Sequence, residues 1–253
     1  MRLAALGPLT LTDDNDMLVD LRGQPADLIR ALALSPRQAC SLDQLAALLE
    51  SPEAGKPSAG TIRVAVARTR KLLAAHALPP GLLETTDHGY RLNVPPGTLD
   101  AERLRLRLAV GACAELAGDE AMAAAVLFRA TRAWPDPAAD LPANPALRAL
   151  LTALAAEHTQ ARKRLVHLLS RLGQHPALVP GLQVQVRVDP ACEWAWVQLA
   201  KALLLSGRAS EAVRAIAQAT IALRQLLGTP PGPALRELLW LAQNEAQGLR
   251  APG

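Results

Sequence analysis

The hydrophobic pattern of the first hundred positions changes from short alternating runs to helical spacing and back again. Up to residue 20, short apolar runs are separated by Gly7-Pro8 and by an Asp/Asn cluster at residues 13–16. This pattern predicts short strands in a small antiparallel sheet. Three helical patterns follow, over residues 24–34, from Ser41 onward, and from Ser58 to about His76.

The boundaries of these helices can be predicted from their capping residues. Ser41 with Gln44 forms a capping box, and Ser58 can cap the third helix. Two β-prone runs then meet at Asp87-His88-Gly89, which predicts a hairpin. A sheet, three helices and a closing hairpin within residues 1–97 are the order of a winged helix-turn-helix domain.

The second half of the chain is predicted to be entirely helical. From Leu99 onward, helical patterns run over about 100–117, 119–133, 145–172, 176–188, 190–206, 208–227 and 233–248. Two helix pairs show the large and small positions of tetratricopeptide (TPR) units. The clearer pair carries Trp196, Leu199, Ala200, Leu203, Gly207, Ala212, Ile216 and Ala219, and the weaker pair carries Gly118, Ala123, Leu127, Ala130 and Pro135. Such hairpins must stack to bury their apolar faces. The expected fold is therefore mainly α, with a winged-helix domain at 1–97 and a TPR-like helical domain at 98–253.

Composition narrows the class of protein. Half of the 253 residues are hydrophobic and 20% are charged, which fits a packed core, and the few aromatic residues leave Ala and Leu to build helices. The opening residues are too short and broken for a signal peptide, and no apolar run has the length of a membrane span. The three cysteines lie far apart and are expected to be reduced. We expect a cytoplasmic protein without membrane contact.

Enzyme chemistry is not expected. No nucleophile–base pair is visible, and Glu157-His158 lacks the second histidine of a zinc motif. The sequence therefore predicts no catalytic residues, no metal and no cofactor.

Charge is distributed unevenly along the first half. Residues 1–98 hold ten Lys/Arg and ten Asp/Glu, so their net charge is zero, yet the stretch from residue 54 to residue 83 contains no acid. That stretch carries Lys56, Arg63, Arg68, Arg70 and Lys71. Polyanion binding depends on such a local patch rather than on the domain total.

The third helix separates these basic residues from an apolar stripe. At 100° per residue, the inward stripe consists of Ile62, Ala65, Val66, Thr69, Leu72 and Leu73. The opposite face presents Arg63, Val64, Ala67 and Lys71, which we expect to face bases in the DNA major groove. Phosphates are expected to contact Arg68 and Arg70 on the flanks, Lys56 before the helix and Arg91 in the hairpin. A merely solvated basic face is the alternative, but such faces mix both signs of charge.

These segments resemble a known family. The stretch from Ile62 to Leu73, followed by Gly89-Tyr90-Arg91-Leu92, looks like the recognition helix and wing of OmpR-type winged helices. Together with Leu6-Gly7-Pro8-Leu9 and the helical half, including residues 227–238, the chain resembles the Streptomyces antibiotic regulatory protein (SARP) family. Those proteins join a winged helix to a bacterial transcriptional activation domain.

The resemblance implies an activator that binds direct-repeat double-stranded DNA near a promoter as a side-by-side pair of chains. It also implies recruitment of RNA polymerase, through sigma or another subunit, by the helical domain. Thr69 departs from the family, which usually has a core Leu there, and Ala65 and Ala67 are smaller than usual. The DNA sequence that the family reads therefore cannot be transferred.

Two other functions remain open from the sequence. The chain can be a TPR-type protein-interaction scaffold whose winged helix no longer reads DNA, which the net-zero N-terminal domain allows. It can also be a ligand-gated regulator with a small effector in its helical half, although no polar cluster in the sequence identifies one.

Overall fold

The computed structural model describes residues 1–13, 15–51, 53, 55–134, 142 and 144–248. The chain divides into two compact units. One consists of Met1–Ala112 with Arg129–Ala161, and the other of Cys113–Phe128 with Arg162–Gly253. Each unit is described by itself below, and the boundary between residues 97 and 98 stays a prediction.

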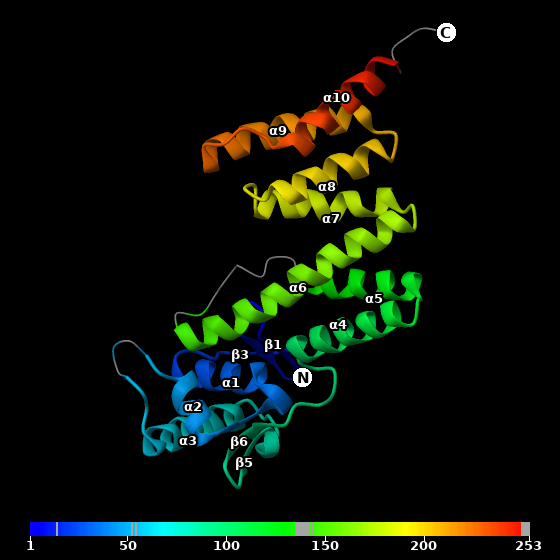
Figure 1. Ribbon diagram of the computed structural model, residues 1–253. Helices are drawn as coiled ribbons and strands as arrows, with labels where there is room; N and C mark the ends of the chain where they lie inside the picture. The colour runs from blue at the N-terminus through cyan, green and yellow to red at the C-terminus, as the bar shows by residue number, and fades with distance from the viewer. Residues whose placement is uncertain (14, 52, 54, 135–141, 143, 249–253) are drawn as a thin grey trace. The chain divides into compact units, whose positions relative to one another are not determined.

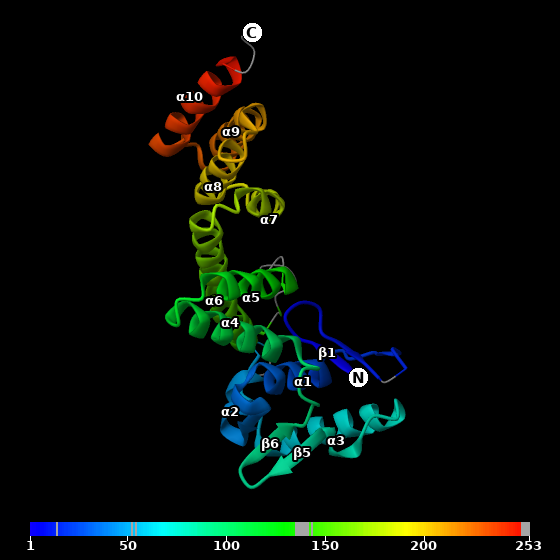
Figure 2. The ribbon, with the colours of Figure 1, turned by 90° about the vertical axis from the view of Figure 1, so that its right-hand side faces the viewer.

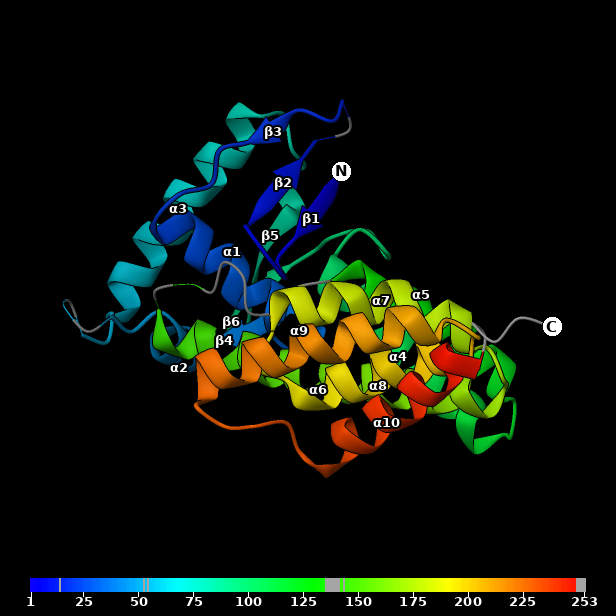
Figure 3. The ribbon, with the colours of Figure 1, turned by 90° about the horizontal axis from the view of Figure 1, so that it is seen from above.

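The first unit opens with the predicted antiparallel sheet. Strands β1 (Arg2–Ala4), β2 (Thr10–Thr12) and β3 (Leu18–Val19) pair in that order, side by side in Figure 3. Leu3 lies opposite Leu11, and Leu11 lies opposite Val19. All three side chains are buried, because residues paired across a ladder share one face of the sheet. This face joins the core of the unit.

The three helices and the closing hairpin of the winged helix-turn-helix follow in the predicted order, and strand β4 (Ala39–Ser41) between the first two helices was not predicted. The domain comprises α1 (Gln24–Leu34), β4, α2 (Leu42–Leu48), α3 (Ala59–Ala75), β5 (Leu83–Thr86) and β6 (Gly89–Leu92). Short 3-10 turns lie at Pro36–Gln38 and Pro80–Leu82. Strands β4, β6 and β5 form a second antiparallel sheet in that order. Strands β6 and β5 lie beside α3 in Figure 2.

Capping residues fix where these helices begin. Ser41 and Gln44 form the expected capping box, in which Gln44 Oε1 accepts a hydrogen bond from the Ser41 amide at 2.8 Å. Ser58 Oγ accepts a hydrogen bond from the Thr61 amide at 3.1 Å. Both caps were predicted from the sequence and are confirmed.

The core of the first unit continues into the first helix after the wing. Leu99 and Leu104 are fully buried in the same apolar cluster as Leu28 and Ile62. Polar contacts also join this helix to the segment after β1. The Asp100 carboxylate accepts hydrogen bonds from the amides of Ala5 at 2.9 Å and Leu6 at 3.2 Å. Burial raises the pKa of Asp100, and these amide contacts oppose the rise.

Arg105 makes a further long-range hydrogen bond within this unit. Its Nη2 donates a hydrogen bond to the Leu34 carbonyl, at the end of α1, at 2.7 Å. Helix C-termini leave carbonyls without intrahelical partners, and a guanidinium satisfies one here. Neither this contact nor the Asp100 contact could be predicted from the sequence, because both join residues more than seventy positions apart.

The remaining helices match the expected ranges to within three residues at each end. They are α4 (Asp100–Leu116), α5 (Glu120–Ala133), α6 (Pro145–Arg171), α7 (His175–Val188), α8 (Glu193–Leu204), α9 (Ala209–Leu227) and α10 (Pro233–Gly248). The largest difference is at α8, which was predicted from residue 190. Residues 190 and 191 form a turn instead, in which the Pro190 carbonyl accepts a hydrogen bond from Trp196 Nε1 at 2.9 Å.

In the second unit, helices α7 to α10 pack against one another in chain order (Figure 1). The clearer TPR pair is α8 with α9, and the apolar residues predicted for it are buried. Gly207 adopts a φ of 70° in the turn, which glycine tolerates without strain. In the weaker pair, Ala123, Leu127 and Ala130 are fully buried, and Pro135 lies outside the described residues.

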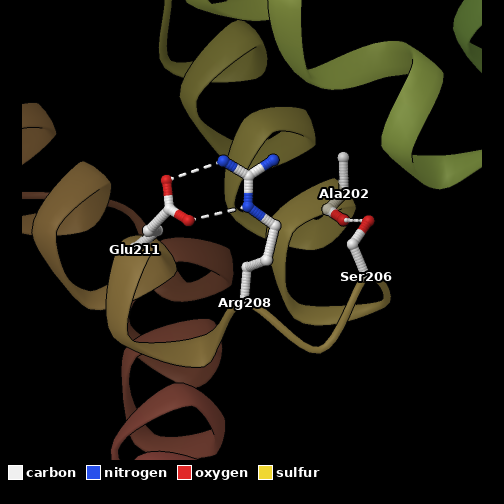
Figure 4. A network of polar contacts seen from close by, with 4 residues as sticks. All are labelled: Ala202, Ser206, Arg208 and Glu211. Carbon is white, nitrogen blue, oxygen red and sulfur yellow. Dashed lines mark hydrogen bonds and ion pairs between the residues drawn. The ribbon is translucent and has the colours of Figure 1, made fainter.

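Two side-chain contacts close the turn between α8 and α9, as Figure 4 shows. Arg208 donates hydrogen bonds from Nε and Nη2 to the two carboxylate oxygens of Glu211, each at 2.7 Å. Ser206 Oγ donates to the Ala202 carbonyl at 2.6 Å. The ion pair lowers the pKa of Glu211 and raises that of Arg208. The glutamate also lies in the first turn of α9, where the helix dipole favours an anion.

Candidate nucleic-acid interface

The inward face of α3 anchors the helix in the core. Ile62, Val66 and Leu73 are at most 3% exposed, as their helical spacing predicted. Thr69 is fully buried, and its Oγ1 donates a hydrogen bond to the Ala65 carbonyl at 2.8 Å. The hydroxyl at this position is therefore satisfied inside its own helix, which removes most of the cost of a polar group in the core.

The opposite face of α3 is open. Arg63, Val64, Ala67 and Lys71 are all exposed. Val64 leaves half of its surface in water, so its methyl groups are accessible to a partner surface. The structure brings these four predicted residues together on one face.

The cations on this helix are available to a ligand. Arg63, Arg68 and Lys71 are exposed, and none of them makes an ion pair within the described part of the chain. Lys56 is also exposed, two residues before the Ser58 cap. Because amide groups and the positive end of the helix dipole lie at that end of α3, the surroundings of Lys56 favour an anion.

Arg70 is placed differently from the other basic residues. Its Nε and Nη2 donate hydrogen bonds to the Leu83 carbonyl at 2.9 and 2.8 Å, and Nη2 donates to Thr85 Oγ1 at 2.8 Å. The guanidinium carbon lies 5.9 Å from the centre of the Tyr90 ring. We expected this side chain to hold a phosphate, but its guanidinium joins α3 to both strands of the β5–β6 hairpin, called the wing below. Sequence reasoning missed this role because the acceptor is a backbone carbonyl.

The wing carries the last predicted site residue. Arg91 is about half exposed, with Nη1 3.9 Å from Glu84 Oε2. Asn93 Nδ2 also donates to that oxygen at 2.9 Å. An exposed pair at this distance is weak and exchanges readily for another anion, so Arg91 can reach a ligand at the cost of little free energy.

The role of Gly89 in the structure differs from the turn position that the sequence indicated. The two-residue turn of the wing is Asp87-His88, and Gly89 is already the first residue of β6. A Cβ atom at Gly89 would lie 2.0 Å from the Cys40 carbonyl oxygen. The glycine therefore permits the close approach of β4 and β6, which holds the wing against the helix-turn-helix.

His158 is fully buried, with Nε2 3.2 Å from the Thr131 carbonyl and its ring 5.7 Å from that of Trp134, so it belongs to the core. Among the described residues, no group of three or more His, Cys, Asp or Glu could hold a metal ion. Across the same residues, no helix combines the length and the apolar character needed to cross a membrane.

Comparisons with known proteins identify the family and relatives of this chain. The family model of the bacterial transcriptional activator domain matches residues 99–239. The transcriptional regulatory protein EmbR of Mycobacterium tuberculosis is 29% identical over 237 residues, which cover 92% of this chain and 61% of EmbR. The regulatory protein DnrI of Streptomyces peucetius is 26% identical over 248 residues, covering 94% of this chain and 90% of DnrI.

A solved structure shows the same fold. The structure of Mycobacterium tuberculosis EmbR in complex with a low-affinity phosphopeptide aligns with a TM-score of 0.67 and 26% identity, over 96% of this chain and 65% of that chain. This chain thus spans about three-fifths of the length of EmbR. These relatives are regulators rather than enzymes, and they confirm the mainly α fold and the resemblance to SARP-type activators. The chain belongs to the bacterial transcriptional activator domain family.

Proposed function

We propose that this protein is a sequence-specific DNA-binding activator of transcription whose helix α3 lies in the major groove. The observation that carries the proposal is the outward face of α3. It presents two exposed cations, Arg63 and Lys71, beside two small apolar residues on a helix that is free of acids. Base edges offer acceptors and thymine methyl groups, which match these two kinds of side chain.

Each of the exposed residues is proposed to contact a particular group of the DNA. Arg63 is suited to a bidentate contact with guanine, and Lys71 to an acceptor on a neighbouring base. Val64 and Ala67 are suited to thymine methyl groups. Phosphates on either side of the groove are assigned to Lys56, Arg68 and Arg91, whose contacts position the protein but carry no sequence information.

For Arg70, which the sequence predicted as a phosphate contact, we propose a different role. Its guanidinium already donates three hydrogen bonds to the wing, and a phosphate would have to displace them. We assign it as a positioning residue, which fixes the wing relative to α3 so that Arg91 and the helix can meet the same duplex.

The activating part of the proposal rests on the family and on the relatives. Residues 98–253, which contain the matched domain, would contact RNA polymerase, and two chains would bind neighbouring direct repeats. Residues 1–97 would form the DNA-binding domain. EmbR and DnrI are named as regulatory proteins, which supports this division of labour.

The experiment begins with selection of bound sites from a random DNA library, using the full chain. Affinity for the selected site and for a scrambled site is then measured by fluorescence anisotropy at several salt concentrations. Arg63→Ala should lose about 1–3 kcal/mol of discrimination between the two sites. Arg68→Ala should weaken binding to both sites and lower the slope of log K against log salt by about 0.9. Arg236→Ala, an exposed residue of α10, is the matched control and should change neither.

The rival function predicts a different result. A scaffold whose winged helix no longer reads DNA would enrich no sequence in the selection, and its DNA binding would show no dependence on Arg63 or Arg68. A tight protein complex that is insensitive to salt, together with that result, would replace the proposed function.

A further inference from the structure

The second unit contains a cavity that the proposed function does not use. It has a volume of about 480 Å³ and is lined by α6, α7 and α8. Its polar lining comes from Lys163, His167 and Ser170 of α6, His175 of α7, and Trp194, Gln198 and Lys201 of α8. Sites for small molecules commonly have volumes of roughly 300–1,000 Å³ and combine an apolar surface with a few polar groups. This cavity has the size and the composition of such a site.

The charge of the lining has one sign. Two lysines and two histidines face the cavity, and no carboxylate is among the lining residues. Neither Lys163 nor Lys201 has an ion-pair partner within the described part of the chain. Two arginines on the same helix do have ion-pair partners: Arg164 pairs with Glu115 at 3.6 Å, and Arg171 pairs with Glu120. The cavity therefore holds cationic groups whose charge is not neutralised by the protein.

An aromatic ring stands beside one of these cations. Lys163 Nζ lies 5.8 Å from the centre of the Trp194 ring, a cation–π distance. Trp196, two residues on, is 6% exposed in the core, whereas Trp194 remains partly exposed in the cavity. A tryptophan face in this position can stack on a planar ligand while the ammonium group meets the ligand's charge.

The remaining lining is apolar. Val166, Leu178 and Ala202 are buried residues that contribute their side chains to the cavity. A ligand complementary to the site must have a hydrophobic body, a flat face and a negative charge. An ion such as phosphate satisfies only the last of these conditions.

We propose that this cavity binds a small aromatic anion, for example an aromatic carboxylate. Lys163 and Lys201 supply charge, Trp194 supplies a stacking surface, and the apolar residues exclude water from the ring. The inference is independent of DNA binding, since its residues lie in α6 to α8 and its test measures the ligand directly.

The probe for the test is 1-naphthoate, added to the full chain labelled with nitrogen-15. The sequence has four tryptophans, so the indole region of the spectrum holds four signals, and Trp194→Leu identifies the one that reports the cavity. Two matched probes separate the contributions: 1-naphthamide is flat but neutral, and cyclohexanecarboxylate is charged but has no π face. The charge variant is Lys163→Gln with Lys201→Gln, and the control is Arg236→Gln, which lies outside the cavity.

The expected result is a saturable shift of the Trp194 signal, with naphthoate bound about five- to tenfold more tightly than naphthamide. The double lysine variant should lose that preference, while Arg236→Gln should keep it. Circular dichroism and the other three indole signals check that each variant is folded. The proposal is overturned by equal affinities for naphthoate and naphthamide in the wild type. It is also overturned if the Trp194 signal does not move up to about 5 mM naphthoate, or if naphthoate and cyclohexanecarboxylate bind alike.

Discussion

Arg70 offers the sharpest test of how the wing is held. Replacing it with Met keeps the aliphatic stem and removes the guanidinium, which lies between α3 and the wing. Two of its hydrogen bonds share the Leu83 carbonyl at 2.9 and 2.8 Å, and the third reaches Thr85 at 2.8 Å. We count the shared pair as one charged hydrogen bond worth about 1.5 kcal/mol and add about 0.5 kcal/mol for the contact with Tyr90. The exposed Thr85 bond adds little, so the wing should lose about 2 kcal/mol of local stability.

Hydrogen exchange of the wing amides measures this loss directly. A decrease of about 2 kcal/mol in the free energy of local opening corresponds to about 30-fold faster exchange in β5 and β6. Tyr90 is the single tyrosine of the sequence, so carbon-13 tyrosine labelling gives a second signal from the wing alone. Arg68→Met is the control, because Arg68 lies on the same helix, is exposed, and should leave the exchange of the wing unchanged.

The charge of Arg70 can be tested apart from its geometry. Arg70→Lys keeps the positive charge but loses the planar fork that reaches two acceptors. We expect it to speed exchange in the wing while leaving the salt slope of DNA binding unchanged. If Arg70→Met leaves wing exchange within about twofold of the wild type, Arg70 does not brace the wing, and a role as a phosphate contact becomes the better explanation.

Three further predictions follow from contacts in the first unit and from the cysteines. Gly89→Ala should destabilise the wing by at least about 3 kcal/mol in urea unfolding, because its Cβ would lie 2.0 Å from the Cys40 carbonyl oxygen. Burial raises the pKa of Asp100, so the folded state binds its proton more tightly than the unfolded state does. The stability of the wild type relative to Asp100→Asn should therefore grow as the pH falls from about 7 to about 4, and a constant difference would contradict this sign. A thiol reagent at mildly alkaline pH should modify exposed Cys113 first, then Cys192, and buried Cys40 last, since burial also raises the Cys40 pKa.

Local sequence signals were sufficient to predict the helices and the closing hairpin, but not strand β4. The helix over Gln24–Leu34 was placed to the residue, and the serine caps set the starts of α2 and α3. These features depend on residues within one or two turns of each other, so their physical cause is visible in a short window. The buried stripe of α3 was predicted for the same reason.

The candidate interface was predicted in part. Helical spacing alone places Arg63 and Lys71 on the face opposite Ile62, because helix geometry fixes that relation. The same spacing cannot distinguish Arg68, which is exposed, from Arg70, which points to the wing. Both lie on the flanks of the helix, and only the position of the neighbouring hairpin decides which flank is covered.

The sequence by itself therefore determined the order of elements, the inward and outward faces of α3 and the absence of acids beside its cations. The tertiary structure alone showed that Arg70 donates hydrogen bonds to the wing, that Gly89 lies against β4 and that Asp100 accepts hydrogen bonds from the amides of Ala5 and Leu6. It also decided that Trp194 shares a cavity with Lys163 and Lys201. The physical reason is the separation along the chain over which each interaction acts. Capping and periodicity act between neighbours in the chain, whereas these contacts join residues that only folding brings within a few ångströms.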